Sequence, residues 1–204
     1  MVYGDFKTLN QALKAFDLQL ENKSGLFANT SRIEPSVFLL QLLDRQLDLA
    51  LAIETEKAKS ELIVTPILLE IRDQAPKPIS YFSGVNLNID SDKGLNGECD
   101  FILSAANNQF EVTAPVLVLV EAKNGEIRSG LGQCTAQMVG SALLNQSQNL
   151  QTSVYGAVTN GVSWRFLRLT AQTLEIDLTE YVIQPQLSLV LGILAQPFLQ
   201  NASI

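Results

Sequence analysis

Residues 116–123 have the sequence VLVLVEAK, in which five apolar residues lead directly into Glu121, Ala122 and Lys123. A segment that is apolar on both faces is typical of a strand in the buried centre of a sheet. Because side chains alternate along a strand, Glu121 and Lys123 project from one face and Ala122 from the other. The sequence therefore predicts a central strand whose end carries a carboxylate and an ammonium group side by side.

Further strands are expected on both sides of this segment. Residues 85–89 alternate between apolar side chains and asparagines, as a half-buried strand does, and the turn-forming residues 90–96 precede another strand. The Asn160-Gly161 pair is a strong signal for a tight hairpin. The expected strands are residues 85–89, 97–104, 116–120, 154–159, 162–169 and 173–178.

Apolar residues spaced three or four apart predict helices in the remaining segments. The helix of residues 54–73 contains Pro66, which must either kink it or restart it with Thr65 as the cap, and the sequence leaves both open. Three antiparallel strands between helices, followed by a helix and further strands, predict an α+β fold with a central mixed sheet flanked by helices. The expected helices are residues 5–20, 54–73, 129–149, 187–199 and one that begins at Pro35 or Ser36.

Length and composition indicate a single domain. The chain has 204 residues, 47% of them hydrophobic, and no linker or internal repeat marks a boundary. No stretch reaches the ~18 apolar residues of a membrane span, and the first residues lack the pattern of a signal peptide. Cys99 and Cys134 have no metal-binding spacing. We therefore expect a cytoplasmic protein with buried free thiols and no membrane partner.

The absence of histidine limits the available chemistry. It excludes the nucleophilic schemes that use histidine, histidine-ligated metals and imidazole acid–base catalysis. Catalysis would have to use carboxylates, lysine, hydroxyl groups or a metal ion. The net charge of −7 opposes nucleic-acid binding at long range, unless the few cations gather on one face.

Asp100 lies on the strand before Glu121 and can meet it across the sheet if the two strands pair antiparallel. Two carboxylates on one spot repel each other unless a cation lies between them. Mg²⁺ prefers one or two carboxylates together with water, a backbone carbonyl and a substrate phosphate. We therefore expect Asp100, Glu121 and the Ala122 carbonyl to bind Mg²⁺ or Mn²⁺, and Lys123 to orient the attacking water.

At these residues the sequence resembles the PD-(D/E)XK nuclease superfamily. The segment Gly97-Glu98-Cys99-Asp100-Phe101 corresponds to the strand that carries that family's metal-binding aspartate, and Glu121-Ala122-Lys123 corresponds to its (D/E)XK tripeptide. The proline of the family's proline–aspartate pair is Cys99 here. The resemblance covers about residues 54–169. It implies a restriction-endonuclease-like core with a helical lead-in of residues 1–53 and an extension of residues 170–204.

The resemblance also implies further site residues. Gln133 corresponds to a glutamine that faces the active site in several relatives. The family often adds a glutamate on its first core helix, for which Glu61 is the preferred match and Glu70 an alternative. Nine residues separate these two glutamates, so both can face the site only if Pro66 bends the helix.

The family likeness implies a magnesium-dependent nuclease that hydrolyses DNA, with DNA as the partner. A catalytically silent member of the fold, acting as a binding or assembly module, is the alternative. Its apolar terminal helices would form a homodimer. A third reading is an unrelated metal-dependent hydrolase of small phosphorylated molecules, which the acidic composition would suit. Divalent-cation binding by Asp100 and Glu121 separates the first reading from the second.

Overall fold

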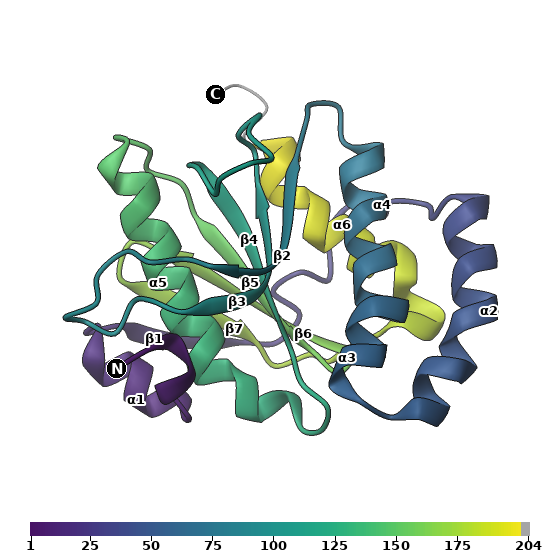
Figure 1. The fold of residues 1–204 in the computed structure, drawn as a ribbon, viewed down its shortest axis with the longest axis horizontal. Helices are drawn as coiled ribbons and strands as arrows, with labels where there is room; N and C mark the ends of the chain where they lie inside the picture. The colour runs from purple at the N-terminus through teal and green to yellow at the C-terminus, as the bar shows by residue number, and fades with distance from the viewer. Residues whose placement is uncertain (201–204) are drawn as a thin grey trace.

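The computed structural model describes residues 1–200, which form a mixed sheet with helices on both faces (Figure 1). The α+β class and the central mixed sheet agree with the sequence prediction. The helical segments are η1 (Tyr3–Asp5), α1 (Leu9–Ala15), α2 (Val37–Ile53), α3 (Glu56–Lys59), η2 (Ser60–Val64), α4 (Thr65–Gln74), η3 (Ile127–Gly130), α5 (Leu131–Ser147) and α6 (Ile183–Gln200). The strands are β1 (Gln19–Lys23), β2 (Ser80–Asn86), β3 (Glu98–Ser104), β4 (Val116–Ala122), β5 (Val154–Thr159), β6 (Ser163–Thr170), β7 (Thr173–Asp177) and β8 (Tyr181–Val182).

The strands of the sheet follow the order β1-β7-β6-β5-β4-β3-β2, and the short β8 pairs with β6. Strands β2, β3 and β4 form an antiparallel meander, and β5 then lies parallel to β4. A parallel neighbour requires a crossover connection, which α5 provides. Strand β4 is therefore internal to the sheet, and all seven of its residues are buried.

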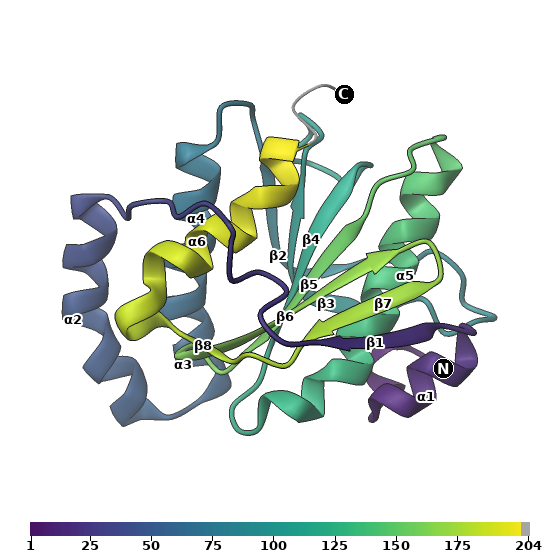
Figure 2. The same cartoon turned by 180° about the vertical axis from the view of Figure 1, so that it is seen from behind.

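Helices cover the two faces of the sheet unequally. Helices α1 and α5 pack on one face, while α2, α3, α4 and α6 lie on the other (Figures 1 and 2). Each face has its own apolar cluster, and β4 contributes to both: Leu119 packs on the α5 side and Val120 on the opposite side. Strand β4, which carries Glu121, is therefore held from both faces.

The N-terminal segment differs from the prediction. The expected helix of residues 5–20 ends at Ala15, and residues 19–23 form the edge strand β1, which pairs parallel with β7. Asp17 has a positive φ of 51°, so the chain leaves the helix there. The side chains of β1 are mostly exposed, so the strand depends on backbone pairing and leaves little apolar periodicity in the sequence.

The first strand of the meander also differs from its expected bounds. Strand β2 begins at Ser80 and ends at Asn86, so Leu87 and Ile89 follow the strand. Both backbone N–H groups bond across the connection to β3, Leu87 to the Gly97 carbonyl and Ile89 to the Leu95 carbonyl. The alternation in the sequence therefore marks an extended segment that continues β2 toward the turn.

Pro66 neither restarts the helix nor leaves Thr65 as a cap. The chain remains helical from α3 into α4 through the π-helical turn η2, and Thr65 itself has helical dihedral angles. A proline nitrogen has no hydrogen to donate, and the wider π turn before it lets the helix continue without that hydrogen bond. The Thr65 hydroxyl shares a hydrogen bond with the Tyr81 hydroxyl at 3.2 Å.

Helix α6 confirms the predicted C-terminal helix, and most of it is buried against the sheet. Within residues 1–200, none of the helices combines the length and the apolar character that crossing a membrane requires.

Candidate functional site

The end of β4 carries a buried carboxylate with two side-chain donors. Lys123 Nζ donates a hydrogen bond to Glu121 Oε1 at 2.5 Å, as expected for residues two apart on a strand. Gln137 Nε2, from α5, donates to Glu121 Oε2 at 2.8 Å. Glu121 and Gln137 have no exposed surface. Strand β4 and helix α5 therefore fix this carboxylate on the α5 face of the sheet.

Asp100 lies beside Glu121, as the antiparallel pairing of β3 and β4 requires. Phe101 pairs with Val120, which places the preceding Asp100 next to Glu121. Asp100 Oδ2 accepts a hydrogen bond from the backbone N–H of Ala122 at 2.7 Å. The structure thus brings together Asp100, Glu121 and Lys123, and the backbone of Ala122 contacts the first of these.

Burial and mutual charge shift the protonation equilibria of this cluster. Burial, and then the charge of Asp100, raises the pKa of Glu121 to about 7, although Lys123 and Gln137 oppose the shift. Burial likewise raises the pKa of Asp100. Burial lowers the pKa of Lys123, but the charges of Glu121 and Asp100 outweigh it and raise that pKa above its ordinary value. The lysine therefore stays cationic while the glutamate is poised to ionise near neutral pH.

Helix α3 adds a further carboxylate and a lysine next to the end of β4. Glu56 Oε2 accepts a hydrogen bond from the backbone N–H of Asn124 at 2.9 Å. Lys59 Nζ donates to the carbonyl and side-chain oxygens of Asn124, at 3.2 and 3.1 Å. The charge of Glu56 contributes to the raised pKa of Asp100. Helix α3 and the loop after β4 thus form one wall of the site.

Two glutamates proposed from the resemblance lie elsewhere. Glu61 is exposed and faces Lys57 in an ion pair at 3.8 Å. Glu70 is buried, but it accepts hydrogen bonds from the backbone and hydroxyl of Ser36, at 2.6 and 2.8 Å, and so ties α4 to the start of α2. The helix carboxylate nearest the site is Glu56, which begins α3. In the sequence, Glu56 looks like an ordinary acidic residue in the first turn of a helix, directly after the cap Thr55, so nothing indicated that it lies near the site.

On α5, the glutamine that contacts Glu121 is Gln137. Gln133 lies one turn earlier, is half-buried, and forms no hydrogen bond to the site within the described part of the chain. Residues four apart share a helix face, so the sequence placed both amides on one side of the helix without distinguishing them. Burial distinguishes them, because only Gln137 lies entirely beneath the surface.

The donor set suits a hard divalent cation. It offers the carboxylates of Asp100 and Glu121, and the proximity of Asp100 already raises the pKa of Glu121. In residues 1–200, no group of three or more His, Cys, Asp or Glu side chains is arranged to hold a metal. Mg²⁺ is commonly bound by one or two carboxylates and takes its remaining ligands from water and substrate phosphate. Two carboxylates fit such an ion better than a metal that needs a full set of protein ligands.

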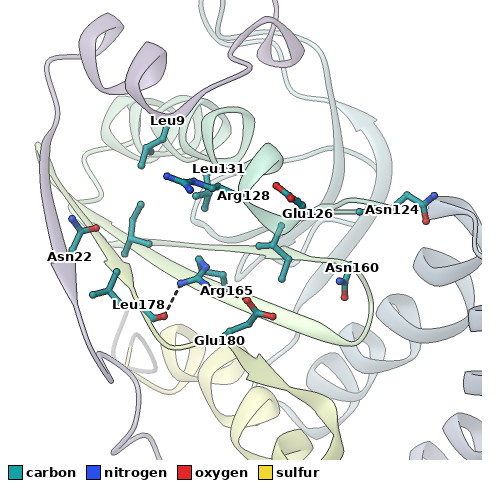
Figure 3. Close-up of a pocket in the computed structure, with 13 residues that line it drawn as sticks. Leu9, Asn22, Asn124, Glu126, Arg128, Leu131, Asn160, Arg165, Leu178 and Glu180 are labelled. Atoms are coloured by element: carbon teal, nitrogen blue, oxygen red, sulfur yellow. Dashed lines mark hydrogen bonds and ion pairs between the residues drawn. The ribbon is translucent and has the colours of Figure 1, made fainter.

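A pocket of about 920 Å³ opens next to Asn124, the residue that follows Lys123, although Asp100, Glu121 and Lys123 do not themselves line it (Figure 3). Its walls come from α1, β1, the loop after β4, η3, α5 and the β5–β8 region. Arg165 is held by the carbonyls of Asp177 and Leu178, both at 2.9 Å, and pairs with Glu180 at 3.3 Å. The lining residues are Leu9, Asn22, Asn124, Gly125, Glu126, Ile127, Arg128, Leu131, Asn160, Arg165, Ile176, Leu178 and Glu180.

Arg128 is the less constrained cation of this pocket. It lies on η3, is exposed, and forms no ion pair with any residue of the described range 1–200. Arg165, in contrast, is already neutralised by Glu180. Arg128 is therefore the pocket's cation that is free to bind an anion.

Comparison with known proteins supplies no family for this chain: no family model matches it, and no curated protein matches it.

Proposed function

We propose that this protein is a magnesium- or manganese-dependent nuclease that hydrolyses phosphodiester bonds of DNA, with Asp100 and Glu121 as metal ligands. One observation carries the proposal. The buried carboxylate of Glu121 and the half-buried carboxylate of Asp100 lie together at the end of β4, and Lys123 forms a hydrogen bond with Glu121. Buried carboxylates are costly unless they have a partner or a function, and strongly shifted pKa values gather at functional sites.

The order of elements supports the same proposal. A helix, an antiparallel meander of β2, β3 and β4, the helix α5 and a strand parallel to β4 follow one another. This order and the positions of Asp100 and Glu121-Ala122-Lys123 are what the resemblance to the PD-(D/E)XK superfamily leads us to expect, and so they support the proposal. Membership of that superfamily is part of the proposal.

Each residue has a role that follows from its environment. Asp100 is oriented by the Ala122 N–H, and Glu121 by Gln137, so both carboxylates are fixed before any ligand arrives. The Ala122 carbonyl is proposed as a third ligand. A bound divalent cation would polarise the phosphate and lower the pKa of a coordinated water. Lys123, cationic at neutral pH, orients that water and offsets the negative charge that develops on the phosphate.

The pocket next to Asn124 is proposed to hold the part of the substrate that extends away from the scissile bond, because Asn124 directly follows Lys123 in the chain. Arg128 is positioned to contact a backbone phosphate there, because no carboxylate in the described chain pairs with it. The remaining lining is a mixture of apolar and amide side chains, which suits contact with sugar and base without demanding a particular sequence.

Calorimetric titration of Mg²⁺ or Mn²⁺, combined with a plasmid-nicking assay, tests the proposal. The wild-type protein is expected to bind the ion and nick the plasmid, and Asp100→Ala is expected to lose both. Glu61→Gln is the matched control, since this exposed carboxylate pairs only with Lys57 in the described structure and its loss should change neither result. Binding without nicking would contradict DNA as the substrate.

A catalytically silent scaffold is the second candidate, and one observation favours it. The Lys123 ammonium already neutralises Glu121 without a metal ion. In that case the fold would serve as a binding or assembly module, with homodimer formation through its apolar helices. Failure of the wild-type protein to bind Mg²⁺ or Mn²⁺ would support this candidate against the nuclease.

A further inference from the structure

Helix α2 exposes more large apolar side chains than it buries. It lies at the outer edge of the molecule, and Leu39, Leu43 and Ala50 on its inner side are buried (Figures 1 and 2). Six large hydrophobic side chains remain exposed on this one helix. They are Val37 (70%), Phe38 (71%), Leu40 (49%), Leu49 (52%), Leu51 (42%) and Ile53 (47%). An exposed apolar concentration of this kind marks an interaction surface.

Three of these exposed residues, Phe38, Leu49 and Ile53, form a single stripe along one side of the helix together with the half-buried Leu42, called here the α2 stripe. At 3.6 residues per turn they lie within an arc of about 60°. The pattern is symmetric in sequence, because Phe38 and Ile53 are equally distant from the midpoint between Arg45 and Gln46, and so are Leu42 and Leu49. A stripe with this symmetry is complementary to a reversed copy of itself.

We propose that the α2 stripe is the interface of a homodimer in which two α2 helices pack antiparallel about a two-fold axis. The axis passes between Arg45 and Gln46. Phe38 of one protomer then lies opposite Ile53 of its partner, and Leu42 lies opposite Leu49. Such self-complementarity is the requirement of an isologous interface, in which the same patch serves both subunits.

The charges beside the stripe fit the same arrangement. Arg45 and Asp48 lie on one edge of the stripe, and neither forms an ion pair with another residue in the described range. Antiparallel packing places Arg45 within one turn of Asp48 of the partner, and the two-fold axis repeats the pair. An anionic lipid surface fits less well, because the polar side of α2 carries Asp44 and Asp48 and the chain has a net charge of −7.

Sedimentation equilibrium over a range of protein concentrations tests the dimer. A single helix pair is smaller than a standard interface, so we expect the mass to rise from 22.3 kDa toward twice that value as concentration increases. Leu49→Glu is expected to keep the protein monomeric. Phe110→Glu is the matched control, because Phe110 is 99% exposed but lies far from α2 in the sequence, and it should leave the association unchanged. A wild-type protein that stays monomeric at all concentrations would overturn the proposal.

A charge exchange tests the antiparallel register. Arg45→Asp and Asp48→Arg should each weaken the dimer, because each places two like charges opposite each other. The double variant should restore the dimer, because an acidic residue at 45 then faces a basic residue at 48 of the partner. Failure of the double variant to recover would overturn the arrangement. The proposal is independent of the metal site, so Asp100→Ala should remain a dimer. Fluorescence of the buried Trp164 shows that each variant is folded.

Discussion

Replacing Glu121 with Gln is expected to stabilise the metal-free protein increasingly as pH rises. Burial and the charge of Asp100 raise the pKa of Glu121 from 4.5 to about 7. The folded protein therefore holds this proton more tightly than the unfolded chain, and the wild-type protein loses stability as pH rises from about 4.5 to about 7. The difference between the two pKa values corresponds to about 3 kcal/mol once Glu121 is ionised. Glutamine is never ionised, so the variant avoids this loss.

Urea unfolding between pH 4 and pH 8, with a chelator present, measures this difference. Trp164 is the chain's single tryptophan and is fully buried, so its fluorescence reports the unfolding transition. The free energy of unfolding of Glu121→Gln minus that of the wild-type protein should grow by about 3 kcal/mol over this range. Glu61→Gln, an exposed control, should show a constant difference. A difference that stays constant for Glu121→Gln as well would refute the reasoning, because the folded protein would then ionise Glu121 as readily as the unfolded chain.

Three further outcomes follow from the structure. Gln137→Leu removes a hydrogen bond that lowers the pKa of Glu121, so the pH at which nicking becomes fast should move upward. A pH–rate profile that is the same as that of the wild-type protein would contradict this role. Arg128→Ala should weaken the binding of a fluorescent oligonucleotide and reduce its salt dependence by about one phosphate contact, while Arg72→Ala on α4 should have no effect. Asp177→Ala should lower the free energy of unfolding by about 3 kcal/mol or more in a urea titration, since this fully buried carboxylate on β7 accepts four hydrogen bonds from the loop after β1, the loop after β7 and β8.

The fold was predictable where apolar periodicity was strong. The buried strand β4, the hairpin around Asn160-Gly161 and helix α2 appear where the sequence places them. Strand β1 was missed because an edge strand with exposed side chains is specified by its pairing with β7, which is distant in sequence. Helix continuity at Pro66 was undecidable because the π turn that accommodates the proline is not a feature of local propensity.

The candidate site was predictable to the extent that strand geometry determines it. Glu121 and Lys123 share a face because they are two apart, and antiparallel pairing brings Asp100 beside them. The contributions of Gln137 and Glu56 depend on how α5 and α3 pack against the end of β4. Helix packing follows from side-chain contacts across the whole core, so spacing along the chain does not determine which residue of a helix faces a site.

The acidic character of the protein is compatible with a nuclease if cation binding comes before substrate binding. Asp100, Glu121 and Glu56 lie close together, with Lys123 and Lys59 beside them, so once Glu121 ionises the metal-free site has an excess of negative charge that repels a polyanion. A divalent ion held by the two carboxylates would reverse the local sign of charge. The proposed function therefore requires DNA binding to depend on the metal ion, and this dependence should disappear together with metal binding in Asp100→Ala. Equal DNA affinity with and without a chelator would mean that DNA binds elsewhere, and the nuclease proposal would lose its site.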